Sequence, residues 1–262
     1  MRTRATAPLL TWLAAAGAMA VVYASLLLDQ DAVEFLIREG GFFETVGALA
    51  LLVATAFFLL AFRRSSGADG YGRIKRFSLL ALALVLFLGA GEEVSWGQKI
   101  FEYPTPDQVR EINAQEEFNF HNLNALDGVL DVTFLFKVFW ATFAVLVPLA
   151  CAVSFRVRGI LGRLIPILPL WLAGLFVLNQ LLAELASVLL SGSERFNGSY
   201  SLEHSRLEIT ECVVAVLFAV AAYVVHRGIP QRSGQPAPAS MPIRTSAEES
   251  AVSGAEKEPH GS

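Results

Sequence analysis

The stretch 77–97, FSLLALALVLFLGAGEEVSWG, decides the fold class of this chain. It carries no charged residue before Glu92 and Glu93, which follow each other near its end. A run of about 20 mainly apolar residues is long enough to cross the hydrocarbon core of a bilayer as a helix. Lipid cannot hydrogen-bond the backbone, so such a run must satisfy its own backbone groups. The stretch therefore predicts a transmembrane helix that ends in two adjacent carboxylates.

Two similar blocks precede it and three follow it. None shows the alternation of apolar and polar residues that is typical of a transmembrane strand. Apolar residues form 54% of the chain and charged residues only 17%, a more apolar balance than that of a soluble domain. The sequence therefore predicts an all-α bundle of six transmembrane helices within residues 1–226. The expected spans are about 8–28, 42–62, 77–97, 132–155, 164–190 and 207–225.

Basic residues give the expected orientation, because Lys and Arg collect in cytoplasmic loops. With a cytoplasmic N-terminus, the inner segments hold Arg2, Arg4, Arg63, Arg64, Arg73, Lys75, Arg76, Arg156, Arg158, Arg163, Arg227 and Arg232. The opposite segments hold only Arg38, Lys99, Arg110, Arg195 and Arg206. We therefore expect a multi-pass protein of the plasma or inner membrane, with both termini in the cytoplasm.

The long outer connection, roughly 98–131, is acidic and should contain a short helix. Thr105-Pro106-Asp107-Gln108 has the pattern of a helix start, with Thr105 as N-cap, and predicts a helix over about Pro106–Ala114. After residue 226 the chain is rich in Ser, Pro, Gly and Glu, with few large apolar residues. Residues 227–262 are therefore expected to form a disordered cytoplasmic tail.

Polar residues concentrate in the predicted outer halves of the helices, while the inner halves are almost purely apolar. Buried ionisable groups are costly in a membrane and usually mark function or pairing. The sequence therefore predicts a polar, acidic pocket in the outer half of the bundle. Its candidate residues are Glu44, Glu92, Glu93, Ser95, Trp96, Gln98, His121, Asn122, Gln180, Glu184, His204, Glu208 and Glu211.

Helical spacing suggests a metal site within this set. His204, Glu208 and Glu211 share one helix face, and His121 from the loop could add a second imidazole. Such donors suit a divalent metal such as zinc, although the cofactor stays undetermined. Glu92 or Glu93 would then be the catalytic base.

Structural explanations compete with this hypothesis. Glu44, Glu203 and His204 lie near helix N-termini, where acids interact with the helix dipole. Deeper acids could form a network with Lys137, Arg195 or Arg206.

The segments Gly91–Gln98, Tyr103–Pro106 and Glu116–Leu123 resemble a family of uncharacterised bacterial membrane proteins. That family's pattern reads Glu-Glu-hydrophobic-Ser-Trp-Gly-Gln, an acidic loop, then Asn-Leu-His-Asn, and Phe120 replaces the Leu here. The resemblance implies that the Glu-Glu helix end and the His121 loop belong to one unit. It implies no activity.

A looser fold-level analogy links the chain to alkaline ceramidase-like membrane hydrolases and progestin/adipoQ-type receptors. Those proteins have seven helices and a zinc ion held by three His. This chain departs from them in having six predicted helices, with His121 and His204 as the only candidate imidazole ligands.

Three function classes follow from the sequence. The first is a metal-dependent hydrolase or transferase that acts on a lipid or lipid-linked substrate at the outer leaflet. The second is a proton-coupled transporter, since intramembrane carboxylates can relay protons. The third is a non-catalytic membrane scaffold or accessory protein. Nucleic-acid binding is not expected, and the sequence leaves the oligomeric state open.

Overall fold

The computed structural model describes residues 6–38, 40–65, 70–101, 103–113, 118, 132–193, 196 and 201–229. Every regular element within these ranges is helical, so the prediction of an all-α fold is confirmed for them. In the part of the chain that the structure describes, five helices are long and apolar enough to cross a membrane. The helix α1 (Thr6–Ala24) is also apolar but is not among these five. His121, Asn122 and most of the acidic loop lie outside the described residues, as does the tail from 230 onward.

The five candidate spans follow the predicted blocks. The short helix α2 (Gln30–Ile37) leads into the first of them, and one later span combines α-helical and π-helical segments. The spans are α3 (Phe42–Arg64), α4 (Gly70–Glu93), α7–η4–α8 (Val132–Trp140, Ala141–Leu146 and Val147–Val153), α10 (Leu170–Leu190) and α11 (Leu202–Gly228).

The π-helical segment η4 has a local cause in the sequence. Pro148 lacks a backbone N–H, so the carbonyl of Ala144 loses its usual helical partner. The helix is wider here, and the backbone N–H of Val147 donates to the carbonyl of Thr142, five residues earlier, as in a π-helix. The span therefore continues through the proline.

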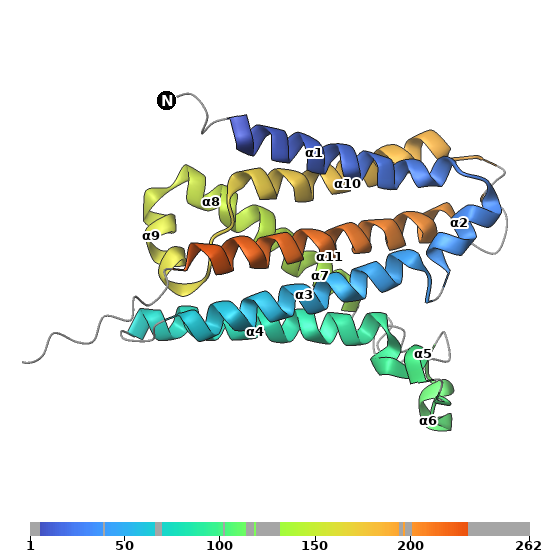
Figure 1. Cartoon of the computed structure of the whole chain (residues 1–262), viewed down its shortest axis with the longest axis horizontal. Coiled ribbons are helices and arrows are strands. Elements are labelled where there is room, and N and C mark those ends of the chain that lie inside the picture. The colour runs from blue at the N-terminus through green and yellow to red at the C-terminus, as the bar shows by residue number, and fades with distance from the viewer. Residues whose placement is uncertain are drawn as a thin grey trace, which may run out of the picture. The chain divides into compact units, whose positions relative to one another are not determined.

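Helix α11 is the most buried of the five spans and lies between α3 and α10 (Figure 1). On one side α4 packs against α3, and on the other α1 packs against α10. The combined span α7–η4–α8 also packs on α10. This arrangement brings the C-terminal ends of α4 and α10 and the N-terminal end of α11 to the same end of the bundle, because α4 and α10 run in one direction and α11 in the other.

Aromatic side chains fill the middle of this bundle. The Phe218 ring of α11 lies 5.6 Å from the Phe139 ring centroid, 6.4 Å from that of Phe143 and 5.4 Å from that of Phe176. Phe176 and Phe218 are fully buried. Ring pairs at such distances add to the stability that burial alone provides.

Several helix boundaries differ from the expected ones, and α4 covers Gly70–Glu93 where the span 77–97 was expected. Helix α11 begins at Leu202 and not at Leu207, so His204 lies in its first turn. The predicted span 164–190 begins only at Leu170, because Pro166 and Pro169 interrupt the helix before it. The preceding segment forms a separate helix, α9 (Phe155–Leu164), that the sequence did not suggest.

The short helix of the outer loop also differs. Helix α6 covers Asp107–Arg110, less than the predicted range, and begins after Pro106 with no side-chain cap. The expected role of Thr105 as N-cap is therefore wrong. Its hydroxyl accepts a hydrogen bond from Gln98 instead, at 2.6 Å.

Candidate functional site

The Glu-Glu motif forms a tight turn at the end of α4. Glu93 is the last residue of this helix, and Ser95, Trp96 and Gly97 follow with φ angles of 45°, 54° and 90°. Left-handed backbone is uncommon for residues other than glycine and marks a conformation that its surroundings must hold in place. Ser95 is fully buried within this turn.

The Trp96 side chain folds back onto α4 and holds the turn. Its Nε1 donates a 2.6 Å hydrogen bond to Oε1 of Glu92. The ring also meets Phe87 edge-on, with centroids 6.5 Å apart. A Cβ at Gly91 would lie only 2.9 Å from the indole, so glycine is what allows this close approach. Glu92 is therefore a positioning residue for the turn.

This contact predicts a difference between two glycines of one helix. Gly91→Ala should be less stable than Gly89→Ala by about 1 kcal/mol, because the new methyl group overlaps the indole. At Gly89 the nearest atom to a new Cβ is a Leu51 methyl at 3.4 Å, an ordinary contact. Helix propensity rises equally in both variants, so it cancels. Thermal unfolding in detergent measures the difference, and equal midpoints would contradict the packing of Trp96 on Gly91.

Gln98 connects the turn to the outer loop. Its Nε2 donates to the Thr105 hydroxyl, and its Oε1 accepts from the backbone N–H of Phe118 at 2.7 Å. The Tyr103 hydroxyl donates to the carbonyl of Trp96 at 3.2 Å. Gln98 and Trp96 therefore fix the geometry of the helix end. Residues 119–131, which contain His121, follow in the chain directly after this anchored segment.

Glu93 of α4 and Glu208 of α11 share a neighbour, the Cys212 thiol. Both carboxylates lie close enough to the Cys212 thiol to act on it electrostatically. Helices α3 and α11 are also in close contact here, since a Cβ on Gly47 would be 3.6 Å from Cα of Cys212. Both acids are half-buried. Two acids that are far apart in the sequence thus both lie within electrostatic reach of Cys212.

Other predicted site residues have structural contacts. Oε1 of Glu184 accepts hydrogen bonds from Arg206 at 2.8 Å and from Gln180 at 2.9 Å. The Glu184 side chain is 58% exposed, so this ion pair adds little stability. Glu44 accepts from the backbone N–H of Gly40 at 2.6 Å and caps the start of α3. The structural alternative is therefore supported for these residues, including the expected pairing with Arg206.

A buried polar cluster of Tyr23, Asn179 and Thr210 was not predicted from the sequence. The Tyr23 hydroxyl donates to Oδ1 of Asn179 at 2.9 Å and lies 3.0 Å from Oγ1 of Thr210. Asn179 also donates to the carbonyl of Thr210 at 3.1 Å and is fully buried. The cluster joins α1, α10 and α11. A polar Asn179 within an apolar helix was the one available signal.

The proposed metal ligands are only partly described. His204, Glu208 and Glu211 lie along α11, and the backbone N–H of His204 donates to the capping hydroxyl of Ser201 at 3.1 Å. Within the described ranges, no three His, Cys, Asp or Glu side chains are grouped so that they could hold a metal ion. His121, the loop ligand that the hypothesis requires, lies outside those ranges.

Comparison of the chain with known protein families, with curated proteins and with solved structures gave no match.

Proposed function

We propose that the chain crosses a bacterial inner membrane six times, with both termini in the cytoplasm. Helix α1 would be the additional span. It packs against α10, and the buried cluster of Tyr23, Asn179 and Thr210 ties it to the bundle. The Tyr23 hydroxyl of α1 has two buried partners, which supports α1 as a permanent part of the bundle.

We further propose that the protein is a metal-dependent hydrolase or transferase, acting on a lipid or lipid-linked substrate at the outer leaflet. The observation that supports this proposal is that Glu93 of α4 and Glu208 of α11 both act electrostatically on the Cys212 thiol. Two half-buried carboxylates on separate helices of a membrane bundle are costly, and such sites are usually functional. They lie where α4 passes into the acidic loop, at the level expected for lipid headgroups.

The described residues offer part of a ligand set for a divalent ion. Carboxylates of Glu208 and Glu211 and the imidazole of His204 lie along successive turns of α11, and His121 would complete the set. A bound ion would supply an activated water. Glu93 would accept the proton of that water as general base, while Glu92 stays bonded to Trp96.

A lipid turnover assay tests this assignment. Purified protein in nanodiscs is supplied with zinc and a total bacterial lipid extract, and the products are identified by mass spectrometry. We expect a zinc-dependent cleaved or transferred product, which Glu93→Gln reduces by about a hundredfold or more. The matched control is Glu203→Gln, at an exposed position in the first turn of α11, which should retain turnover. The enzyme proposal fails if no lipid is consumed, or if Glu93→Gln turns over as the control does.

The scaffold alternative has an observation in its favour. Glu184, Gln180 and Arg206 bond to one another across α10 and α11, as a purely structural network would. Loss of a co-purifying partner on disruption of this surface, with no metal bound, would support that function.

The transporter alternative is disfavoured by the middle of the bundle. Stacked rings of Phe139, Phe143 and Phe218 occupy the depth that a proton path would have to cross. Proton flux driven by a pH gradient in proteoliposomes, abolished by Glu184→Gln, would revive it.

A further inference from the structure

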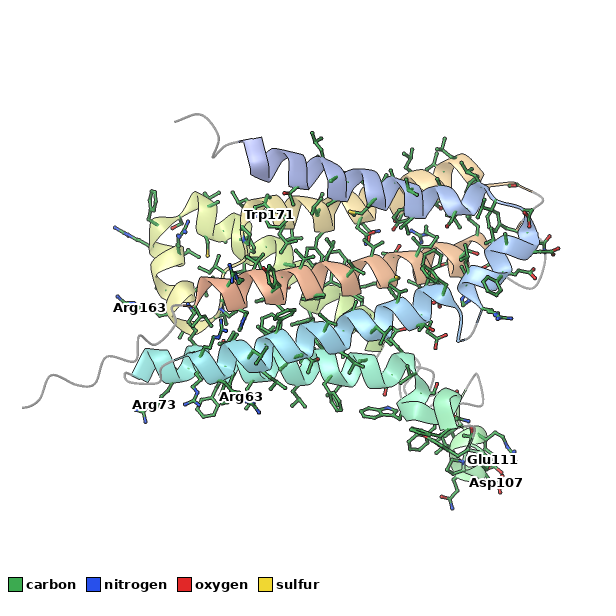
Figure 2. The ribbon with its side chains drawn as sticks, in the orientation of Figure 1. Arg63, Arg73, Asp107, Glu111, Arg163 and Trp171 are labelled. Atoms are coloured by element: carbon green, nitrogen blue, oxygen red, sulfur yellow. The ribbon has the colours of Figure 1, made fainter. Side chains whose placement is uncertain are left out.

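The end of the bundle opposite the acidic loop carries a dense set of cations. Figure 2 shows Arg63, Arg73 and Arg163 at this end, and Asp107 and Glu111 at the other. We call the set the basic end: Arg63, Arg64, Arg73, Lys75, Arg76, Arg156, Arg158, Arg163 and Arg227. The described carboxylates all belong to segments at the opposite end: 29–34, 44, 92–93, 107–111, 184 and 203–211. Among the described residues, the cations therefore gather at one end of the bundle and the carboxylates at the other.

Contacts join these cations across four helices. Nζ of Lys75 on α4 donates to the carbonyl of Gly162 on α9 at 3.0 Å. The Arg76 guanidinium lies over the Phe62 ring of α3, 4.4 Å from its centroid. Arg64 of α3 and Arg227 of α11 both act electrostatically on the imidazole of His226. The cations thus lie on one surface. Helices α3 and α11 end here, α4 begins here, and α9 packs against α4.

Two buried nitrogen atoms at this end are unsatisfied. Within the described residues, neither Nε of Arg76 nor Nδ1 of His226 has a hydrogen-bond partner. The His226 side chain is only 6% exposed. Buried polar groups are nearly always paired in folded proteins, so the Nε–H of Arg76 is an unmet donor beside several cations.

Helix α9 has the composition of a helix that lies in a membrane interface. Val157, Ile160, Leu161 and Leu164 share one face, while its arginines Arg156, Arg158 and Arg163 lie on the other. Ile160 is 62% exposed, and the preceding Val153 is 88% exposed. An amphipathic helix with basic residues on its polar face rests between headgroups and acyl chains, with its apolar side in the lipid.

We propose that the basic end, with α9 as its platform, binds the phosphate groups of anionic phospholipids in the adjoining leaflet. Arg156 and Arg158 approach the headgroups from α9, and Lys75 holds α9 against α4 through Gly162. The exposed apolar side chains of Val153, Phe155 and Ile160 select a lipid over a soluble anion, because they need acyl chains to cover them. The site is independent of the proposed chemistry at the acidic end, so either can fail alone.

Native mass spectrometry of the full chain tests the proposal. Protein is exchanged into nanodiscs with equal amounts of phosphatidylcholine and phosphatidylglycerol, released, and its retained lipids are counted. We expect preferential retention of phosphatidylglycerol by the wild type. Each arginine near an anionic surface contributes a factor of about five. The double variant Arg156→Gln/Arg158→Gln should therefore lower the preference about 25-fold. Both side chains are exposed, so the bundle should stay folded.

The matched control is Arg110→Gln/Lys137→Gln, which removes the same charge away from the basic end and should leave the preference unchanged. Equal retention of the two lipids by the wild type overturns the proposal, as does an equal loss in both double variants. Retention of phosphatidylglycerol that appears only after removal of residues 231–262 also overturns it, because the chain's own tail would then cover the basic end. Displacement of the retained lipid by millimolar inorganic phosphate would show a soluble-anion site instead.

Discussion

Phe218→Ala should destabilise the protein by about 3–5 kcal/mol, the range for removing a large aromatic side chain from a packed core. Phe218 is fully buried on the most buried span. Its ring contacts Phe136 and Phe139 of α7, Phe143 of η4 and Phe176 of α10. Alanine would leave a cavity where three spans meet, and rings held by several neighbours cannot all move to fill it.

The loss of stability can be measured through the two buried cysteines. Cys151 and Cys212 are buried in the folded chain, so a thiol-reactive dye reports unfolding as the temperature rises. Phe77→Ala is the control, since Phe77 is 65% exposed on the surface of α4 and should change the midpoint little. A similar midpoint for the two variants would contradict the packing of α7 and α10 around α11.

Asn179→Leu should cost about 2 kcal/mol, because it removes two buried hydrogen bonds. The Tyr23 hydroxyl would lose Oδ1 of Asn179, and the carbonyl of Thr210 would lose the amide donor. Leucine branches at Cγ as asparagine does and suits a membrane helix, so an insertion defect is not the expected cause. The same dye assay measures the loss.

Gln180→Leu is the control for Asn179→Leu. It lies next in the chain, but its hydrogen bond to Glu184 is exposed, so its loss should be within about 0.5 kcal/mol. Tyr23→Phe should cost less than Asn179→Leu, since the amide of Asn179 would still reach Thr210. If Asn179→Leu is as stable as the wild type, the cluster does not join α1 to α10 and α11.

Sequence reasoning identified the spans because length and hydropathy determine them. It placed 42–62, 77–97 and 132–155 close to the helices observed, and it found Glu184 near Gln180 from their spacing of four residues. It underestimated α11 because the polar residues 203–206 lower local hydropathy, whereas the helix continues through them with Ser201 as its cap. It missed α9 because that helix is short and half basic.

Contacts between distant segments could not be predicted from one sequence. The Trp96 side chain folds back on its own helix, with Trp96 in left-handed backbone and glycine required at 91. Periodicity in the sequence cannot reveal such a contact. The partnership of Tyr23 with Asn179 and Thr210 depends on which helices become neighbours. The effect of Glu93 and Glu208 on the same thiol, Cys212, depends on the same packing, which one sequence does not reveal.

Metal content tests the central proposal most directly. The full chain is purified without chelator, and its divalent ions are counted by plasma mass spectrometry. We expect about one zinc or similar ion per chain. Glu208→Gln and His121→Ala should each lose it, whereas Glu203→Gln, one turn away on α11, should keep it. A wild-type protein without a bound ion, even after zinc is added, would contradict the proposed site, as would full zinc retention by His121→Ala.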